Sequence, residues 1–159
     1  MPKLAFEFNP FERSDAVLSK ENKRRAAKEI QTFIVEAVLA DIGDGTSPVQ
    51  GGDWKRGLSK DYKKEKGKVS SSVFANLELT GDMLDSLDVR IVSGKKMSLE
   101  VPASQAQKAD GNNRGTYGKG TRTQPKRART FIPYKKGQTF TKEIWEGING
   151  IIEEFAEED

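Results

Sequence analysis

The feature that most constrains the fold is an apolar stripe at helical spacing between about Ser14 and Ile42. Apolar residues recur there every three or four positions, with charged and amide side chains on the opposite side, which is typical of an amphipathic helix that covers a core. Glycines and a proline follow at 43–48 and end the pattern. The sequence therefore predicts one long helix near the N-terminus. The stripe consists of Ala26, Ile30, Phe33, Ile34, Ala37, Val38 and Ile42.

A second stripe predicts a helix close to the C-terminus. Apolar residues lie at helical spacing over 140–155, and either Thr139 or Thr141 supplies a cap oxygen. Gly147 and Gly150 interrupt this stretch and are expected to weaken the helix, because glycine has a low helix propensity.

Three short segments predict strands. The first two, "LDVRIV" (87–92) and "KMSLEV" (96–101), alternate apolar and polar residues and are separated by Ser-Gly-Lys, which predicts a β-hairpin. The third, "RTFIP" (129–133), indicates a short strand that a proline ends. A short basic helix is expected at about 59–66. Together these elements predict an α+β domain, in which a long N-terminal helix and a C-terminal helix cover a small antiparallel sheet.

Two segments lack the periodic pattern of the helices and strands: one precedes the domain, which spans 13–159, and the other is a loop within it. Residues 1–12 are apolar and have no helical period, so they predict an extended arm that docks on a partner. Residues 111–129 predict a flexible, Gly-rich basic loop that is too long for an ordinary connection. A sheet of three strands has edges that must be paired or covered, and assembly of several copies into a ring would do this. The aromatic residues of the arm are Phe6, Phe8 and Phe11.

Composition excludes most familiar active sites. The chain has no cysteine and no histidine, so it lacks disulfides, thiol nucleophiles and the commonest general base and metal ligand. No Gly-Lys pair has the flanking residues of a phosphate-binding loop. Asp82, Asp85 and Asp88 have no second carboxylate cluster beside them and make a poor magnesium site. We therefore expect a protein that is not an enzyme and has no cofactor or metal. No apolar run is long enough to span a membrane and no signal peptide is recognised, so no membrane partner is expected.

The net charge is only +3, but the charges are unevenly distributed. Basic residues cluster at 20–28, 55–68 and 114–129, whereas the C-terminal end is acidic. The simplest interpretation of each run is a solvated face. For the 111–129 loop two sharper alternatives stay open, namely contact with DNA phosphates and contact with the acidic end of an adjacent copy. The candidate basic contacts are Arg114, Lys119, Arg122, Lys126, Arg127 and Arg129, and the candidate acidic contacts are Glu153, Glu154, Glu157 and Glu158.

The stretch "LELTGDMLDSL" (77–87) predicts a change from strand to short helix. It alternates apolar and polar residues up to Thr80 and then continues at helical spacing after a Gly-Asp break. Thr80 supplies a cap oxygen and Asp82 a negative charge at the positive end of the helix. The residues expected to be buried are Met83, Leu84 and Leu87.

Four segments in a fixed order resemble the bacteriophage neck or tail-completion proteins, also called virion-morphogenesis or minor tail proteins. They are "SPVQGGDWKRGLSKDYKKEKG" (47–67), "LELTGDMLDSL" (77–87), "RTFIP" (129–133) and "GQTFTKEIWEGINGII" (137–152), which together extend over most of the chain from about residue 43. The resemblance implies a structural protein that forms a homo-oligomeric ring at the head–tail junction. Such a ring binds neighbouring connector and tail proteins, surrounds the DNA channel and belongs to the virion after assembly in the host cytoplasm. The resemblance also places the functional surfaces at 1–12 and 111–129.

The basic runs favour a second function, a small stand-alone nucleic-acid-binding module. Tyr62 and Tyr117 lie among the lysines and arginines, and aromatic rings can stack on bases while the cations neutralise phosphates. The low net charge of +3 argues against this alternative. The two functions differ in what they require of the isolated protein, since a ring protein assembles into discrete oligomers and a binding module remains a monomer.

Overall fold

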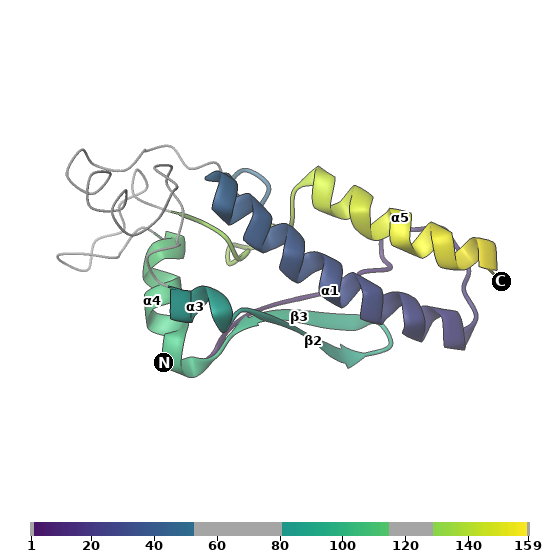
Figure 1. Ribbon diagram of the computed structural model, residues 1–159, viewed down its shortest axis with the longest axis horizontal. Helices are drawn as coiled ribbons and strands as arrows, with labels where there is room; N and C mark the ends of the chain where they lie inside the picture. The colour runs from purple at the N-terminus through teal and green to yellow at the C-terminus, as the bar shows by residue number, and fades with distance from the viewer. Residues whose placement is uncertain (1, 53–80, 115–128, 159) are drawn as a thin grey trace.

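A three-stranded antiparallel sheet lies against two long helices (Figure 1). The structure, a computed structural model, describes residues 2–52, 81–114 and 129–158. The strands are β1 (Leu4–Phe8), β2 (Asp88–Ser93) and β3 (Lys96–Val101), and the helices are α1 (Lys20–Asp44), α3 (Gly81–Asp85), α4 (Ala103–Arg114) and α5 (Lys142–Glu158). The predicted α+β fold is confirmed. The short helix expected at 59–66 and the extended residues 77–80 lie outside the described residues.

Helix α1 begins and ends at clear local signals. Ser19 caps its first turn, because the Asn22 N–H donates to Ser19 Oγ (3.1 Å). Gly45 ends the helix in the left-handed conformation (φ 79°), which glycine adopts without steric cost. The start predicted at Ser14 was too early, since the Ser14 hydroxyl instead accepts a hydrogen bond from the Ala16 N–H (3.2 Å) in a local turn. The buried stripe is confirmed for Ala26, Ile30, Ile34, Val38 and Ile42.

The predicted hairpin is confirmed, and β3 is the central strand of the sheet. Leu99 on β3 pairs with Val89 on one side and with Phe6 on the other. This row lies on the inner face, where Leu99 and Val89 are completely buried beneath the helices. Because side chains alternate along a strand, the residues between them form an outer face that carries the charged side chains of the sheet.

The N-terminal segment is a strand of this sheet and not a free arm. β1 pairs antiparallel with β3, from Leu4 opposite Val101 to Phe8 opposite Met97. The Phe8 ring meets the Phe140 ring edge to face, with centroids 5.1 Å apart, and Phe8 is 8% exposed. The prediction that residues 1–12 dock on a partner was therefore wrong, because their apolar side chains complete the core of their own chain.

The connection from β1 to α1 is held by two cation–π contacts. The Lys23 ammonium lies 4.9 Å from the centre of the Phe11 ring, and the Arg13 guanidinium lies 4.4 Å from the Trp145 ring. Contacts of this kind contribute about 0.5–1 kcal/mol each at exposed sites. Phe11, the third aromatic residue of the predicted arm, is thus half-buried against its own molecule.

Helix α4 was not predicted and replaces the first part of the predicted basic loop. The helix runs through 111–114, so the loop expected at 111–129 begins no earlier than residue 115. Ala106 and Ala109 form its buried side, and it follows Pro102, a residue well suited to the start of a helix. Three alanines and a few polar residues make a weak apolar stripe, which explains why periodicity did not reveal this helix.

The turn at 81–87 forms the predicted short helix α3. Met83 and Leu87 are buried as expected, at 1% and 6% exposure, whereas Leu84 packs against the core only in part. The Ser86 N–H and hydroxyl both bond the Met83 carbonyl (3.2 and 2.6 Å), which closes the helix before β2 begins.

Gly147 allows α1 and α5 to approach closely. A Cβ at this position would lie 2.1 Å from the Phe33 ring of α1, whereas a Cβ at Gly150 would meet nothing within 4 Å. We expect Gly147→Ala to destabilise the protein by about 1–3 kcal/mol, because the ring must move out of a packed interface. Gly150→Ala should stabilise it by about 0.5–1 kcal/mol through helix propensity. Urea unfolding of both variants measures the difference, and equal effects of the two would contradict the close contact.

Candidate functional site

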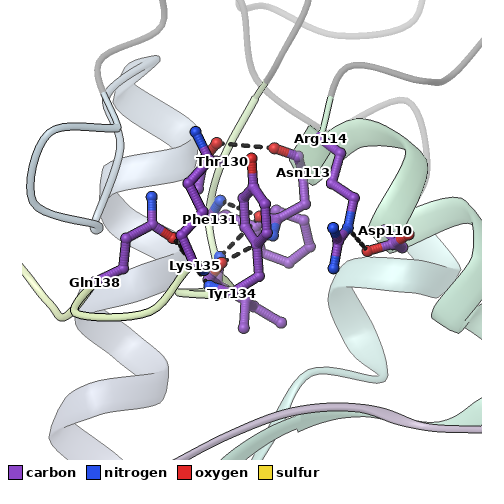
Figure 2. Close-up of polar contacts among 9 residues, drawn as sticks. Asp110, Asn113, Arg114, Thr130, Phe131, Tyr134, Lys135 and Gln138 are labelled. Carbon is purple, nitrogen blue, oxygen red and sulfur yellow. Dashed lines mark hydrogen bonds and ion pairs between the residues drawn. The ribbon is translucent and has the colours of Figure 1, made fainter. Parts of the chain in front are cut away.

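A buried asparagine organises a polar junction between α4 and residues 129–138 (Figure 2). Asn113 Oδ1 accepts hydrogen bonds from the Phe131 and Ile132 N–H groups (2.7 and 3.0 Å), and Asn113 Nδ2 donates to the Ile132 carbonyl (2.8 Å). The residue is completely buried. The predicted strand at 129–133 was wrong, because this segment satisfies its backbone groups on an asparagine side chain and not on a neighbouring strand.

Backbone and hydroxyl contacts complete the junction. The Thr130 hydroxyl donates to the Asn113 carbonyl (2.8 Å), and the Arg129 N–H donates to the Asn112 carbonyl (2.7 Å). Ser47 Oγ in turn donates to the Thr130 carbonyl (2.5 Å) from the loop after α1. Three parts of the chain that are far apart in sequence therefore meet in one buried hydrogen-bond network.

A tight turn continues the network beyond Ile132. Gln138 Oε1 accepts from the Tyr134 and Lys135 N–H groups (2.9 and 3.0 Å), as Figure 2 shows. Gly137 takes the left-handed conformation (φ 84°) that lets the chain reverse before it enters α5. Thr139 follows this turn, and its Oγ1 accepts a hydrogen bond from Trp145 Nε1 on α5 (3.0 Å). The second cap candidate, Thr141, lies directly before the first residue of α5.

Two of the six candidate basic residues are described, and both belong to the junction. Arg114 Nε donates to Asp110 Oδ1 (2.6 Å), and its guanidinium lies 4.4 Å from the centre of the Tyr134 ring. Arg129 is 9% exposed, so it lies inside the fold and not on an open surface. The other four candidates, Lys119, Arg122, Lys126 and Arg127, lie outside the described residues.

The junction fixes both ends of the segment 115–128, which carries four basic and no acidic residues. Arg114, the last residue of α4, precedes the segment. Arg129 follows it, and the Arg129 N–H donates to the Asn112 carbonyl. The sequence shows the polar residues of this network, but it gives no periodic signal that Asn113 is buried. Its neighbour Asn112 is also an asparagine, but the Asn112 side chain donates to the Lys108 carbonyl of its own helix (2.9 Å).

The acidic candidates lie beside the first basic run of the same molecule. Asn22 Nδ2 in the first turns of α1 donates to the Phe155 carbonyl near the end of α5 (3.3 Å), and the Arg25 guanidinium lies 5.2 Å from the centre of the Phe155 ring. Figure 1 shows the end of α5 next to the start of α1. One end of the molecule thus presents both charges. The exposed acidic candidates are Glu153, Glu154 and Glu157, and the side chain of Glu158 lies outside the described residues.

Three carboxylates have shifted pKa values. The hydrogen bond from Arg24, together with the charge of its guanidinium, lowers the pKa of Glu21. Burial alone would raise the pKa of Glu100. The Lys3 ammonium (2.9 Å) and the Arg90 guanidinium (3.4 Å) lower this pKa by more than burial raises it, so it lies below its usual range. Glu100 therefore stays ionised and ties β3 to β2 and to the residue before β1. Burial raises the pKa of Asp41 at the end of α1, and the Asp44 and Glu143 carboxylates add to this effect.

The described residues hold no group of three acidic side chains placed to bind a metal ion. Over the same part of the chain, no helix has the length and apolar character to cross a membrane. What the junction does is hold together Arg114 and Arg129, the two described residues that flank 115–128. Scans of protein-family models and searches of curated proteins and solved structures found no match to this chain.

Proposed function

We propose that this protein is a structural component of a bacteriophage virion. It forms a ring at the head–tail junction and joins the connector to the tail around the DNA channel, after assembly in the host cytoplasm. The observation that carries the proposal is the ordered set of four segments that resembles the neck and tail-completion proteins. Its partners are further copies of itself and the connector and tail proteins above and below.

The arrangement of three of these segments supports the proposal. The Thr141 N–H donates to the Pro48 carbonyl and the Gln50 N–H donates to the Thr139 carbonyl, both at 2.9 Å. Ser47 in the same loop bonds Thr130, as described above. The described parts of 47–67, 129–133 and 137–152 therefore form one unit around the junction. A resemblance carried by residues that share a structural task is more informative than one carried by scattered residues.

The basic segment between Arg114 and Arg129 is the proposed contact with the particle. In a ring its cations would face phosphates in the channel and make contacts that depend on salt but not on base sequence. The same cations could instead bind Glu153, Glu154 and Glu157 of the adjacent copy. Both uses bring the cations of the segment next to negative charge, which reduces their mutual repulsion.

Assembly of the purified protein tests the ring. Size-exclusion chromatography with light scattering, followed by electron microscopy of the main species, should show a discrete oligomer with a central channel, either alone or after addition of the connector protein. A chain that stays monomeric under both conditions and binds duplex DNA tightly at low salt would support the stand-alone nucleic-acid-binding module and contradict the ring.

Replacing Arg122, Lys126 and Arg127 together by serine tests whether the segment contacts DNA or an adjacent subunit. If rings form but particles lose their DNA, the cations face the channel; if rings fail to form, they join subunits. If neither property changes, the segment is a solvated connection and the basic contacts are withdrawn. A triple replacement of the exposed Lys95, Lys136 and Lys142 by serine removes the same charge elsewhere and should leave both properties intact.

A further inference from the structure

The outer edge of β2 is an open strand edge next to the start of α1. Among residues 2–52, 81–114 and 129–158, the strand order β1-β3-β2 leaves β2 with a neighbouring strand on one side only. At Val89 the Gln31 side chain of α1 donates to the backbone carbonyl, so the peptide groups of Val89 point away from β3. Since every second residue of a strand points its N–H and C=O in the same direction, those of Ile91 point outward too. Ile91 is 37% exposed.

This edge borders a groove of about 600 Å³ between α1 and the tip of the hairpin. Ala27 and Ile91 supply apolar surface, and Lys20, Lys23 and Arg24 supply positive charge. One carboxylate, Glu21, also lines the groove, but it is paired with Arg24 on the next turn (2.7 Å). The groove therefore combines an apolar floor, a cationic side and, at Ile91, outward backbone groups that no described strand pairs with, next to the Val89 carbonyl that Gln31 already bonds.

These three features select the chemistry of the occupant. A second copy that paired through the same edge would bring two sets of lysine and arginine side chains together, which is unfavourable. A nucleic acid would use the cations but not the outward N–H and C=O groups or the apolar floor. An extended peptide uses all three, because its backbone adds to the sheet, alternate side chains face the floor and acidic side chains face the cations.

We propose that the β2 edge and the groove beside it bind an extended acidic segment of a partner protein as an added strand. The site is formed by the described residues alone and does not depend on the virion function. It also differs from the junction around Asn113, which lies at the C-terminal end of α4. Because a strand edge without such a partner invites non-specific pairing, occupancy would also protect the protein from aggregation.

The binding test uses the full chain and a fluorescently labelled peptide of about ten residues that alternates valine with glutamate. Anisotropy should show saturable binding, and a peptide with lysine in place of glutamate should bind at least about tenfold more weakly. In a backbone hydrogen-exchange measurement, the Ile91 amide should become protected when the glutamate peptide is present. Absence of saturable binding, or equal binding of the two peptides, overturns the proposal.

Two matched pairs of variants locate the site. Ile91→Glu should weaken binding by about tenfold or more, whereas Val92→Glu, which adds the same charge to a 41% exposed neighbour outside the groove, should change it by less than about threefold. Lys20→Glu should weaken binding more than Lys28→Glu, since Lys28 is exposed on the same helix but does not line the groove. Equal effects within either pair overturn the assignment.

The same variants show whether the groove instead binds nucleic acid or a second copy of the chain. Binding of a duplex oligonucleotide that depends on Lys20 but not on Ile91 would assign the groove to nucleic acid. Self-association that Ile91→Glu abolishes, in the absence of peptide binding, would assign the edge to a second copy. Each of these results overturns the acidic-segment proposal.

Discussion

Replacing Asn113 by alanine is expected to destabilise the protein by about 3–5 kcal/mol, because buried N–H and C=O groups that lose their partners cost about 1–3 kcal/mol each. The substitution leaves the Phe131 and Ile132 N–H groups and the Ile132 carbonyl unpaired in a site that water does not reach. Urea unfolding measures the loss. Hydrogen exchange should show that the amides of Phe131 and Ile132 open before those of the sheet.

The neighbouring Asn112 provides the control. Its side chain makes one hydrogen bond within α4, and its junction contact uses the backbone carbonyl, which alanine retains. Asn112→Ala should therefore cost no more than about 1 kcal/mol. Similar losses for the two variants would show that the junction does not depend on the buried side chain.

Deleting residues 2–8 is expected to abolish cooperative folding. The deletion removes β1, exposes the edge of β3 and takes two phenylalanine rings away from Phe140. Loss of a buried phenylalanine side chain alone costs about 3–5 kcal/mol, which is a large part of the total stability of a domain this size. Circular dichroism and thermal unfolding should show a broad transition or none. If the shortened chain unfolds cooperatively near the thermal midpoint of the full chain, residues 2–8 are not needed for the fold, and the prediction that they dock on a partner stands again.

A full-length control separates the strand from its exposed side chains. Ala5 and Glu7 face outward on β1, and Glu7 Oε2 lies 3.4 Å from Lys96 Nζ on the exposed face. Replacing Ala5 by serine and Glu7 by threonine keeps the strand and its inward rings. Because an exposed ion pair contributes at most about 1 kcal/mol, this variant should fold normally.

The elements that were predicted correctly are those whose signal is local. The stripe through Ile30 and Ile34 fixes α1 by its period, and the alternation on both sides of the Ser-Gly-Lys turn fixes the hairpin. The strand at 129–133 failed for the opposite reason. An apolar pair bounded by a proline indicates an extended chain, but whether such a chain joins a sheet depends on its partner, which here is Asn113.

The candidate site was predicted only in part. The excess of basic residues before Arg129 is visible in composition, because charge needs no knowledge of the fold. The role of Asn113 is not visible, since an asparagine between Asn112 and Arg114 is ordinary in a loop and its burial results from contacts nearly twenty positions away. The groove beside β2 was also missed, because it needs the register of the hairpin against α1.

The pairing of β1 with β3 has a consequence for the order in which the chain is made. Leu4 leaves the ribosome before its partner Val101 has been synthesised, and Phe140, which covers the rings of β1, follows later still. Until then the first apolar residues have no native partner, and contacts this distant in sequence form slowly. A nascent chain arrested before Phe140 should therefore keep its N-terminus accessible to proteases and chaperones, while α1, whose contacts within the helix are local, can already be helical.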